Sequence, residues 1–402
     1  MACNVVWMPG TRPHTPSLLL LRFGFLFSGA VTSLLGPMLP AFPHGWGLHD
    51  SGSGLLLGAQ FLGLCTGSLA LYSDLRKTLL LGYSLATAAL LTLALCVLSI
   101  RGYLPGVAAL FVLGIGLGQV STSINLLAAK RYESPRERSA QLSLLNLMWS
   151  LGAIAAPAIA GAYLKYSGQF LLLLTFTAVG LIQLVGNGRT TTSRESGATG
   201  PAAQTSATTI SPAMLCFYCL CFLLYGGVES SLGGWLSTYA MRYTSLHIAG
   251  AAYCSMALWA AIAAGRAGTP LVLRFLSERT IRLSGIALAT AAVIALRLAH
   301  TALQVASCAA VAGLGIAPFV PITFSILISS RPSARQAGAA TANIGLGAAL
   351  FSLLTGALSS YAGSLQLALL MPIALGITLF GFCTRGMRNA PEEPRSSLPA
   401  PR

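Results

Sequence analysis

Glu229 is the residue of this chain whose type and surroundings most clearly indicate chemistry. It lies in the stretch YGGVESSLGGWLSTY, residues 225–239, within a long apolar run that begins at Pro212. The other eight of the nine acidic residues fall in predicted loops, tails or helix ends. A charged side chain in the middle of a bilayer costs about 2.5–3.5 kcal/mol even on the mildest scale, so an acid in such a run normally faces a cavity or a partner.

Three roles for Glu229 are open from the residues alone. A carboxylic acid in an apolar environment favours its neutral form, so it can bind and release a proton. When protonated it donates a hydrogen bond, and when ionised it accepts several, as the hydroxyl groups of a solute require. The third role is structural, because Arg266 also lies in an apolar run and is a suitable partner for a buried carboxylate.

Further polar and aromatic residues in apolar runs are candidates for the lining of a binding cavity. Amides both donate and accept hydrogen bonds, and indole rings offer flat apolar faces that suit sugar rings. Both kinds also have structural uses, since amides join helices and tryptophan often marks membrane interfaces. The candidates are Gln60, Gln119, Asn125, Asn146, Asn343, Trp149, Trp235 and Trp259, with Arg266 as a further candidate substrate ligand.

The elements that position these residues are predicted to be membrane-spanning helices. Only 8% of residues are charged, 55% are hydrophobic, and the mean hydropathy is +0.74. Apolar runs of about 20 residues recur, long enough for a helix to cross a bilayer, and lipid does not tolerate unsatisfied backbone groups. We therefore predict an all-α polytopic membrane protein with twelve spans: 18–40, 51–72, 77–99, 103–128, 139–164, 169–187, 212–239, 247–271, 282–299, 301–328, 335–361 and 365–383.

The distribution of positive charge predicts the orientation of these spans. With the N-terminus inside, 18 of the 24 Lys and Arg residues fall in inner loops and tails. Such a bias identifies the cytoplasmic side, so the net charge of +15 indicates topology and not nucleic-acid binding. The first 17 residues contain no small-residue cleavage site, so we expect a cytoplasmic tail and not a cleaved signal peptide. The predicted location is the inner or plasma membrane, with both termini cytoplasmic.

The chain contains an internal repeat. An offset of 197 residues aligns GAVTSLLGPML (29–39) with GGVESSLGGWL (226–236) and also pairs Asn146 with Asn343. The first-half counterpart of Glu229 is the neutral Thr32. Parallel repeats characterise a class of transporters that bind their substrates near the repeat axis, which favours the two asparagines as ligands. The predicted divisions are a tail (1–17), a six-helix bundle (18–187), a polar cytoplasmic loop (188–211), a second six-helix bundle (212–385) and a tail (386–402).

These features resemble the major facilitator superfamily. The loop motif of that family is similar to GSLALYSDLRK (67–77), and the resemblance implies that Asp74, Arg76 and Lys77 belong to a cytoplasmic gate. LLGPMLPAF, GVESSLGGWLSTY and GLGIAPFVPITFSIL resemble the fucose-permease-like branch, which implies sugar:proton symport. Relatives in that branch often carry an acid four residues before the span-4 asparagine, but here Ser121 precedes Asn125. Proton coupling then rests on Glu229, or the protein is a facilitator.

The expected function is secondary transport of a small neutral solute, such as a sugar, by alternating access. The alternative is an efflux antiporter for amphipathic compounds, because SLGAIAAPAIAG (150–161) resembles the antiporter motif. A cavity rich in Asn, Gln and Trp would favour a sugar, and one lined by Phe, Met and Leu would favour efflux. We expect no enzyme activity, no cofactor and no metal site. Cys216, Cys219 and Cys221 are spaced like metal ligands, but no partner His or second Cys pair accompanies them, and a Walker loop is absent. The expected partners are a small-molecule substrate and lipid, not nucleic acid, and the protein is expected to be a monomer.

Overall fold

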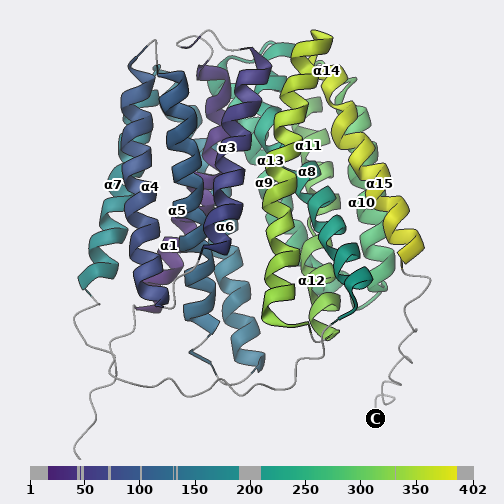
Figure 1. Ribbon diagram of the computed structural model, residues 1–402. Coiled ribbons are helices and arrows are strands. Elements are labelled where there is room, and N and C mark those ends of the chain that lie inside the picture. The colour runs from purple at the N-terminus through teal and green to yellow at the C-terminus, as the bar shows by residue number, and fades with distance from the viewer. Residues whose placement is uncertain are drawn as a thin grey trace, which may run out of the picture.

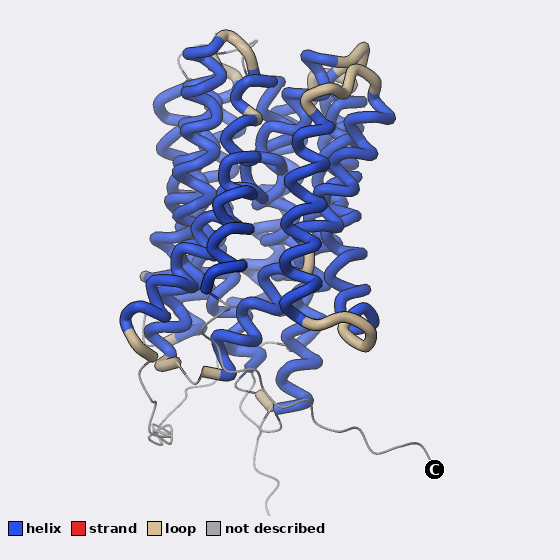
Figure 2. Tube along the Cα trace, turned by 90° about the vertical axis from the view of Figure 1, so that its right-hand side faces the viewer, coloured by secondary structure: helices blue, strands red, loops and turns tan. Residues whose placement is uncertain are grey.

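A computed structural model describes residues 17–42, 46, 49–70, 74–99, 102–129, 131–132, 135–189, 210–330 and 332–386. The two tails and the central polar loop predicted from the sequence lie almost wholly outside these described residues. The described chain is a set of long helices that run side by side, with most loops and turns at the two ends (Figure 2). Twelve helical segments within it are long and apolar enough to span a membrane, which confirms the predicted number.

Six spans precede the central loop, and they begin where capping residues permit. The Oγ atom of Ser17 accepts the backbone N–H of Leu20 at the start of the first helix, and Asp74 caps the third span by accepting the N–H of Arg76 at 2.9 Å. Such side chains satisfy N–H groups that a helix leaves open. The elements are α1 (Leu18–Met38) with the short η1 (Leu39–Ala41), α3 (Asp50–Leu69), α4 (Leu75–Val97), α5 (Tyr103–Ala129), α6 (Pro135–Leu164) and α7 (Gln169–Arg189).

Six spans follow the central loop. The first of them begins at the Ser211 cap, with Pro212 in the first helical position, where its missing N–H costs nothing. The elements are α8 (Pro212–Tyr243), α9 (Ile248–Val272), α10 (Glu278–Leu296), α11 (Ala302–Ile316), α12 (Phe319–Ser329), α13 (Ala334–Ala362), α14 (Leu365–Ala368) and α15 (Leu370–Gly386). α11 and α12 together form one span, as do α14 and α15.

The tenth span differs from the prediction of one continuous helix over residues 301–328. A turn at Ala317 and Pro318 separates α11 from α12. Proline cannot donate a hydrogen bond, and its ring clashes with the carbonyl group four residues earlier, so it interrupts the helical ladder. The hydropathy of the run predicted the span correctly, but the effect of Pro318 on its path was missed.

The helices form two side-by-side groups, one from each half of the chain (Figure 1). In the first group α1 packs on α6, α3 on α5, and α4 on both α5 and α7. In the second group α8 packs on α13 and α15, and α11 packs on α9 and α10. Two seams join the groups, one between α3 and α13 and the other between α6 and α9, with α1 meeting α8 between them.

The repeat found in the sequence is visible in these contacts. The 197-residue offset pairs the second span with the eighth and the fifth with the eleventh, so the two seams are copies of one another. Gly36 and Gly233, which the same offset aligns, meet where α1 crosses α8: a Cβ atom added to Gly36 would collide with the carbonyl oxygen of Gly233. The pseudo-symmetry axis therefore passes close to these two glycines.

We predict that Gly36→Ala destabilises the protein by about 1–3 kcal/mol, because the added methyl group would overpack the α1–α8 contact. Thermal unfolding of the purified protein in detergent measures the effect. Gly268→Ala is the matched control, since a Cβ atom at Gly268 meets no neighbouring atom within 4 Å. Both substitutions raise helix propensity equally. Equal unfolding temperatures for the two variants would contradict the close contact.

Candidate functional site

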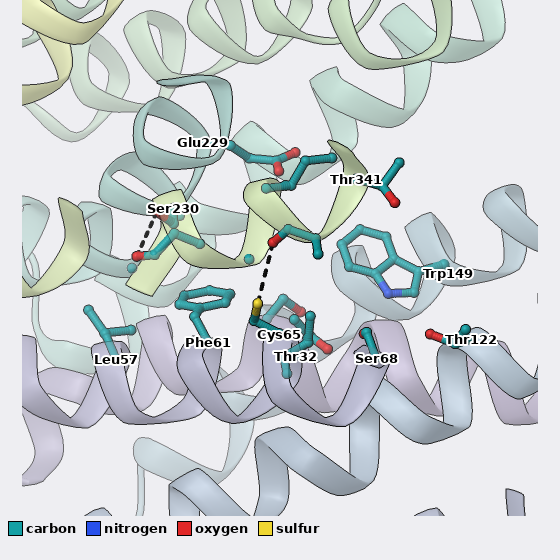
Figure 3. Close-up of a pocket in the computed structure, with 18 of the residues that line it drawn as sticks. Thr32, Leu57, Phe61, Cys65, Ser68, Thr122, Trp149, Glu229, Ser230 and Thr341 are labelled. Carbon is teal, nitrogen blue, oxygen red and sulfur yellow. Dashed lines mark hydrogen bonds between the residues drawn. The ribbon is translucent and has the colours of Figure 1, made fainter. Parts of the chain in front are cut away.

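A cavity of about 370 Å³ lies between the two groups of helices. Both halves contribute to its wall, through α1, α3, α5 and α6 from the first and α8, α9 and α13 from the second. In Figure 3 the labelled side chains surround this space, with Glu229, Thr341 and Trp149 on one side and Leu57, Phe61 and Cys65 on the other. A volume of this size suits a small organic solute.

The cavity extends toward one end of the helices. Its wall runs from Leu57 and Gly234, within α3 and α8, to Ser68, Leu69 and Gly338. Leu69 is the last residue of α3 and Gly338 lies near the start of α13, at the end where the sequence places the basic loops. We call this end the inner end and the opposite one the outer end. The cavity thus extends toward the inner end.

Glu229 faces the cavity and has two partners. The hydroxyl group of Tyr225, one helical turn earlier on α8, donates to Oε1 of Glu229 at 2.8 Å. Nη2 of Arg266, on α9, donates to the same oxygen at 3.2 Å and to the Tyr225 hydroxyl at 3.5 Å. The side chain of Glu229 is 16% exposed and that of Arg266 is 25% exposed. A neutral ion pair therefore stands at the wall of the cavity.

This arrangement offsets the free-energy cost of placing an acid in a membrane span. An ion that leaves water loses several kcal/mol of solvation, which a partner of opposite charge and well-placed donors offset. The pairing of Glu229 with Arg266, one of the three predicted roles, is present in the structure. Among the described residues, both donors to Glu229 bond to Oε1 and none bonds to Oε2, so the proton and ligand roles stay predictions.

Two of the three predicted tryptophans line the cavity, and they meet there. Trp149 on α6 and Trp259 on α9 have ring centroids 5.8 Å apart, with the planes at 74°. Such an edge-to-face contact is favourable for aromatic rings and joins the two halves at the wall. Trp235 lies elsewhere: it is fully buried and donates through Nε1 to the carbonyl oxygen of Ser352 at 3.2 Å.

The predicted amides do not line the cavity. Gln60 is buried and donates to the carbonyl oxygen of Thr32 at 3.0 Å, which holds α3 against α1. Asn125, Asn146 and Asn343 each donate to the carbonyl oxygen four residues earlier on their own helix. Asn146 is exposed on the helix surface. Their predicted role as substrate ligands stays untested, but none of them contributes to the wall of the cavity in this conformation.

The predicted gate residues lie at the inner end, at the start of α4. Asp74 caps this helix and forms a weak, exposed ion pair with Lys77 at 3.9 Å. Arg76 follows in the first turn of the helix. These contacts are local to α4, so the structure brings the gate motif together but leaves its action between the two halves as a prediction.

Several residues of the wall were not singled out by the sequence. They are small hydroxyl-bearing residues and one thiol: Ser33, Ser68, Thr122, Ser230, Thr341 and Cys65. Such residues are common in membrane helices, so their type alone carries no signal. Tyr225 could have been found, because residues four apart on a helix share a face and Tyr225 precedes Glu229 by one turn.

Comparison with known proteins agrees with this architecture. Residues 21–348 match the protein family described as Major Facilitator Superfamily. No curated protein sequence is significantly similar to the chain. Among solved structures, a bacterial homologue of the human lysosomal transporter Spinster in an inward-facing, occupied conformation is 15% identical, with a TM-score of 0.76 over 95% of this chain and 98% of that one.

Two sugar transporters also share the fold. A D-xylose:proton symporter is 12% identical, with a TM-score of 0.73 over 92% of this chain and 96% of that chain. A variant of the E. coli fucose:proton symporter is 17% identical, with a TM-score of 0.61 over 93% of this chain and 99% of that chain. Identities this low establish a common fold and no common substrate.

We predict that Arg266→Gln destabilises the protein by about 1–3 kcal/mol, because it leaves Glu229 partly buried without its counter-charge. The double variant Glu229→Gln, Arg266→Gln is expected to lose less stability than the sum of the two single variants, since both remove the same interaction. Thermal unfolding of the four proteins measures this coupling. If the stability losses of the two single variants added up strictly in the double variant, the ion pair would contribute nothing to stability.

Proposed function

The chain belongs to the major facilitator superfamily, and from this premise we propose that it carries a small neutral organic solute, with Glu229 coupling transport to a proton. Members of this family are secondary transporters and not enzymes. The observation that carries the proposal is the cavity shared by both halves, at whose wall Glu229 is the single acidic residue in the described part of the chain. A site on the boundary between two bundles is exposed to one side or the other as the bundles rock.

The proposed moving parts are the two bundles, residues 18–187 and 212–385. The seams between α3 and α13 and between α6 and α9 would open at one end while they close at the other. The proposed location is the inner or plasma membrane, with the protein a monomer and both termini in the cytoplasm, as the basic inner loops favour. In this orientation the structure corresponds to a state whose cavity extends toward the cytoplasm.

The hydrogen-bonding character of the wall supports a solute with hydroxyl groups. The hydroxyl groups of Thr32, Ser33, Ser230 and Thr341 already donate their hydrogen atoms to backbone carbonyl oxygens. A hydroxyl group has one donor and two lone pairs, so these four present only acceptors to the cavity. Oε2 of Glu229 is an acceptor too. These five residues therefore favour a solute that brings hydrogen-bond donors.

Charge and shape support a neutral solute with an apolar face. The charge of Glu229 is already neutralised by Arg266 at 3.2 Å. A cation would therefore be repelled by Arg266, and an anion would be repelled by the hydrogen-bond acceptors of the wall. Trp149 and Phe61 offer flat apolar surfaces across the cavity from one another (Figure 3). A pyranose ring has both an apolar face and donating hydroxyl groups, and the motifs shared with the fucose-permease-like branch favour the same class.

A second candidate, efflux of amphipathic compounds, is favoured by the other part of the wall. Leu57, Leu64, Leu69 and Ile344 line the cavity, whereas the predicted amides do not. Such a surface binds apolar groups without directional contacts. The two candidates differ in the part of the ligand that the cavity holds. A sugar is held through its hydroxyl groups, and an amphipathic compound is held through its apolar body.

The proton step follows from the contacts of Glu229. While ionised, the carboxylate accepts hydrogen bonds from both Tyr225 and Arg266. Protonation removes the charge that holds the guanidinium group, so Arg266 is released and the hydroxyl of the acid becomes a donor to the cavity. The protonated and ionised forms thus present different hydrogen bonds to a solute, which is the differential interaction that coupling requires.

We predict that Glu229→Gln abolishes accumulation driven by a pH gradient but retains counterflow exchange, because glutamine keeps the shape and cannot carry a proton. Substrates are first found by a thermal-shift screen of the purified protein against sugars, nucleosides and drugs, and uptake into proteoliposomes is then measured with and without the gradient. Glu278→Gln, at an exposed acid of α10, is the control. Unchanged accumulation by Glu229→Gln would refute the proton role.

Methyl ethers test how the solute is recognised. We predict that O-methylation of a recognised hydroxyl weakens binding of a sugar by about tenfold, because it removes one donated hydrogen bond to an acceptor of the wall. The measurement compares a sugar from the screen with its mono-O-methyl and deoxy derivatives. Similar losses for methylation and deoxygenation are expected. Undiminished binding of the ethers would favour the amphipathic candidate.

A further inference from the structure

Asp50, the first residue of α3, bridges the two halves at the outer end. Both of its carboxylate oxygens accept hydrogen bonds from the guanidinium group of Arg242 on α8, with Oδ2 at 2.6 Å from Nη1. The hydroxyl group of Ser359, on α13, donates to Oδ2 at 2.5 Å. Asp50 is 8% exposed. One buried carboxylate of the first half is thus held by two helices of the second.

The surrounding contacts cross the same boundary. The backbone N–H of Ser51 donates to Oγ of Ser360 at 2.8 Å. One turn further along, Gly54 and Gly356 bring the backbones of α3 and α13 into contact. The outer end of this seam is therefore closed by an ion pair, by hydrogen bonds and by close backbone packing, whereas the cavity lies on its inner side.

The geometry of the ion pair makes its opening an all-or-none event. A two-pronged contact between guanidinium and carboxylate is among the stronger polar interactions in proteins, and it needs both groups in one orientation. If α3 moves away from α8 and α13, both prongs and the Ser359 bond are lost together. Removing one partner alone leaves an uncompensated charge in a partly buried place, which is costly.

The ion pair is connected to Glu229 through one helix. α8 runs without a break from Pro212 to Tyr243 and carries both Glu229 and Arg242. At 1.5 Å per residue these two side chains lie about 20 Å apart along its axis. The Glu229–Arg266 pair lies within the second half, while the Asp50–Arg242 pair joins the halves. A movement of α8 at the cavity is thus transmitted to the outer boundary.

We propose that Asp50, Arg242 and Ser359 form an outer latch that sets the balance between the inward-open and outward-open states. This inference rests on the transport cycle proposed above, but not on the identity of the solute. The latch is closed while the cavity extends inward, and it must separate before the outer end opens. Its loss shifts the population toward the outward-open state.

Distances between spin labels on the intact protein test the latch. Leu104 on α5 and Leu303 on α11 are 72% and 77% exposed at the outer end, and cysteines at these two positions on a cysteine-free background report the separation of the halves there. Leu19 at the start of α1 and Phe275 after α9 are 62% and 80% exposed at the inner end and give a second pair. Pulsed electron resonance in nanodiscs measures both distances without any substrate.

The expected result is a reciprocal change. Asp50→Asn and Arg242→Gln each raise the population with a long outer distance by about tenfold or more, and the inner distance shortens in the same fraction of molecules. The double variant shifts the population no further than either single variant, because one interaction is lost in all three. Glu278→Gln is the matched control and leaves both distances unchanged.

Two outcomes would overturn the latch. Unchanged distances in folded Asp50→Asn would show that the contact does not hold the halves together. A longer outer distance without a shorter inner one would show that it only stabilises the fold locally. The exchange variant Asp50→Arg, Arg242→Asp keeps two opposite charges at this contact. Wild-type distances in this variant would show that the single variants act through the lost ion pair and not through a folding defect. Loss of gradient-driven accumulation in Glu229→Gln with unchanged distances separates the proton step from the latch.

Discussion

The interior of a bilayer has no water to solvate a charge or an open backbone group, and the rest of this structure depends on that constraint. The backbone is satisfied within helices, so the chain is helical along the spans apart from short turns in the tenth and twelfth. Two acids in or at the edge of the spans are each held in an ion pair with an arginine. Glu229 has Arg266 and Asp50 has Arg242, and both acids have a hydroxyl group as an additional donor.

The two pairs differ in what they connect. Glu229 and Arg266 lie on adjacent helices of one bundle, and their charges can change at the cavity while that bundle stays intact. Asp50 and Arg242 belong to different bundles, so the second pair responds to the position of one bundle against the other. Because α8 carries a member of each, the chemistry at the cavity and the geometry at the outer end share one rigid element.

The sequence predicted the fold well and the site only in part. Spans follow from hydropathy, and the offset of the repeat aligned Gly36 with Gly233, although it did not predict that they touch. The directions of the amides could not be predicted, because a helix that is apolar on every side has no polar face to orient it. Asn125 and Asn343 bond to their own helix, as single helices allow. The contact between Asp50 and Arg242 joins residues far apart in the sequence, for which local patterns give no signal.

Thr32 and Glu229 occupy equivalent places in the two copies of the repeat, and both line the cavity. The mate of Arg266 is Leu69, which also borders the cavity. After duplication of an ancestral six-helix unit, the two copies have thus diverged at the same positions: one holds an acid and its base, and the other holds a hydroxyl and an apolar residue. The two bundles are nearly symmetric, but the site between them is not. A solute therefore binds there in a defined orientation.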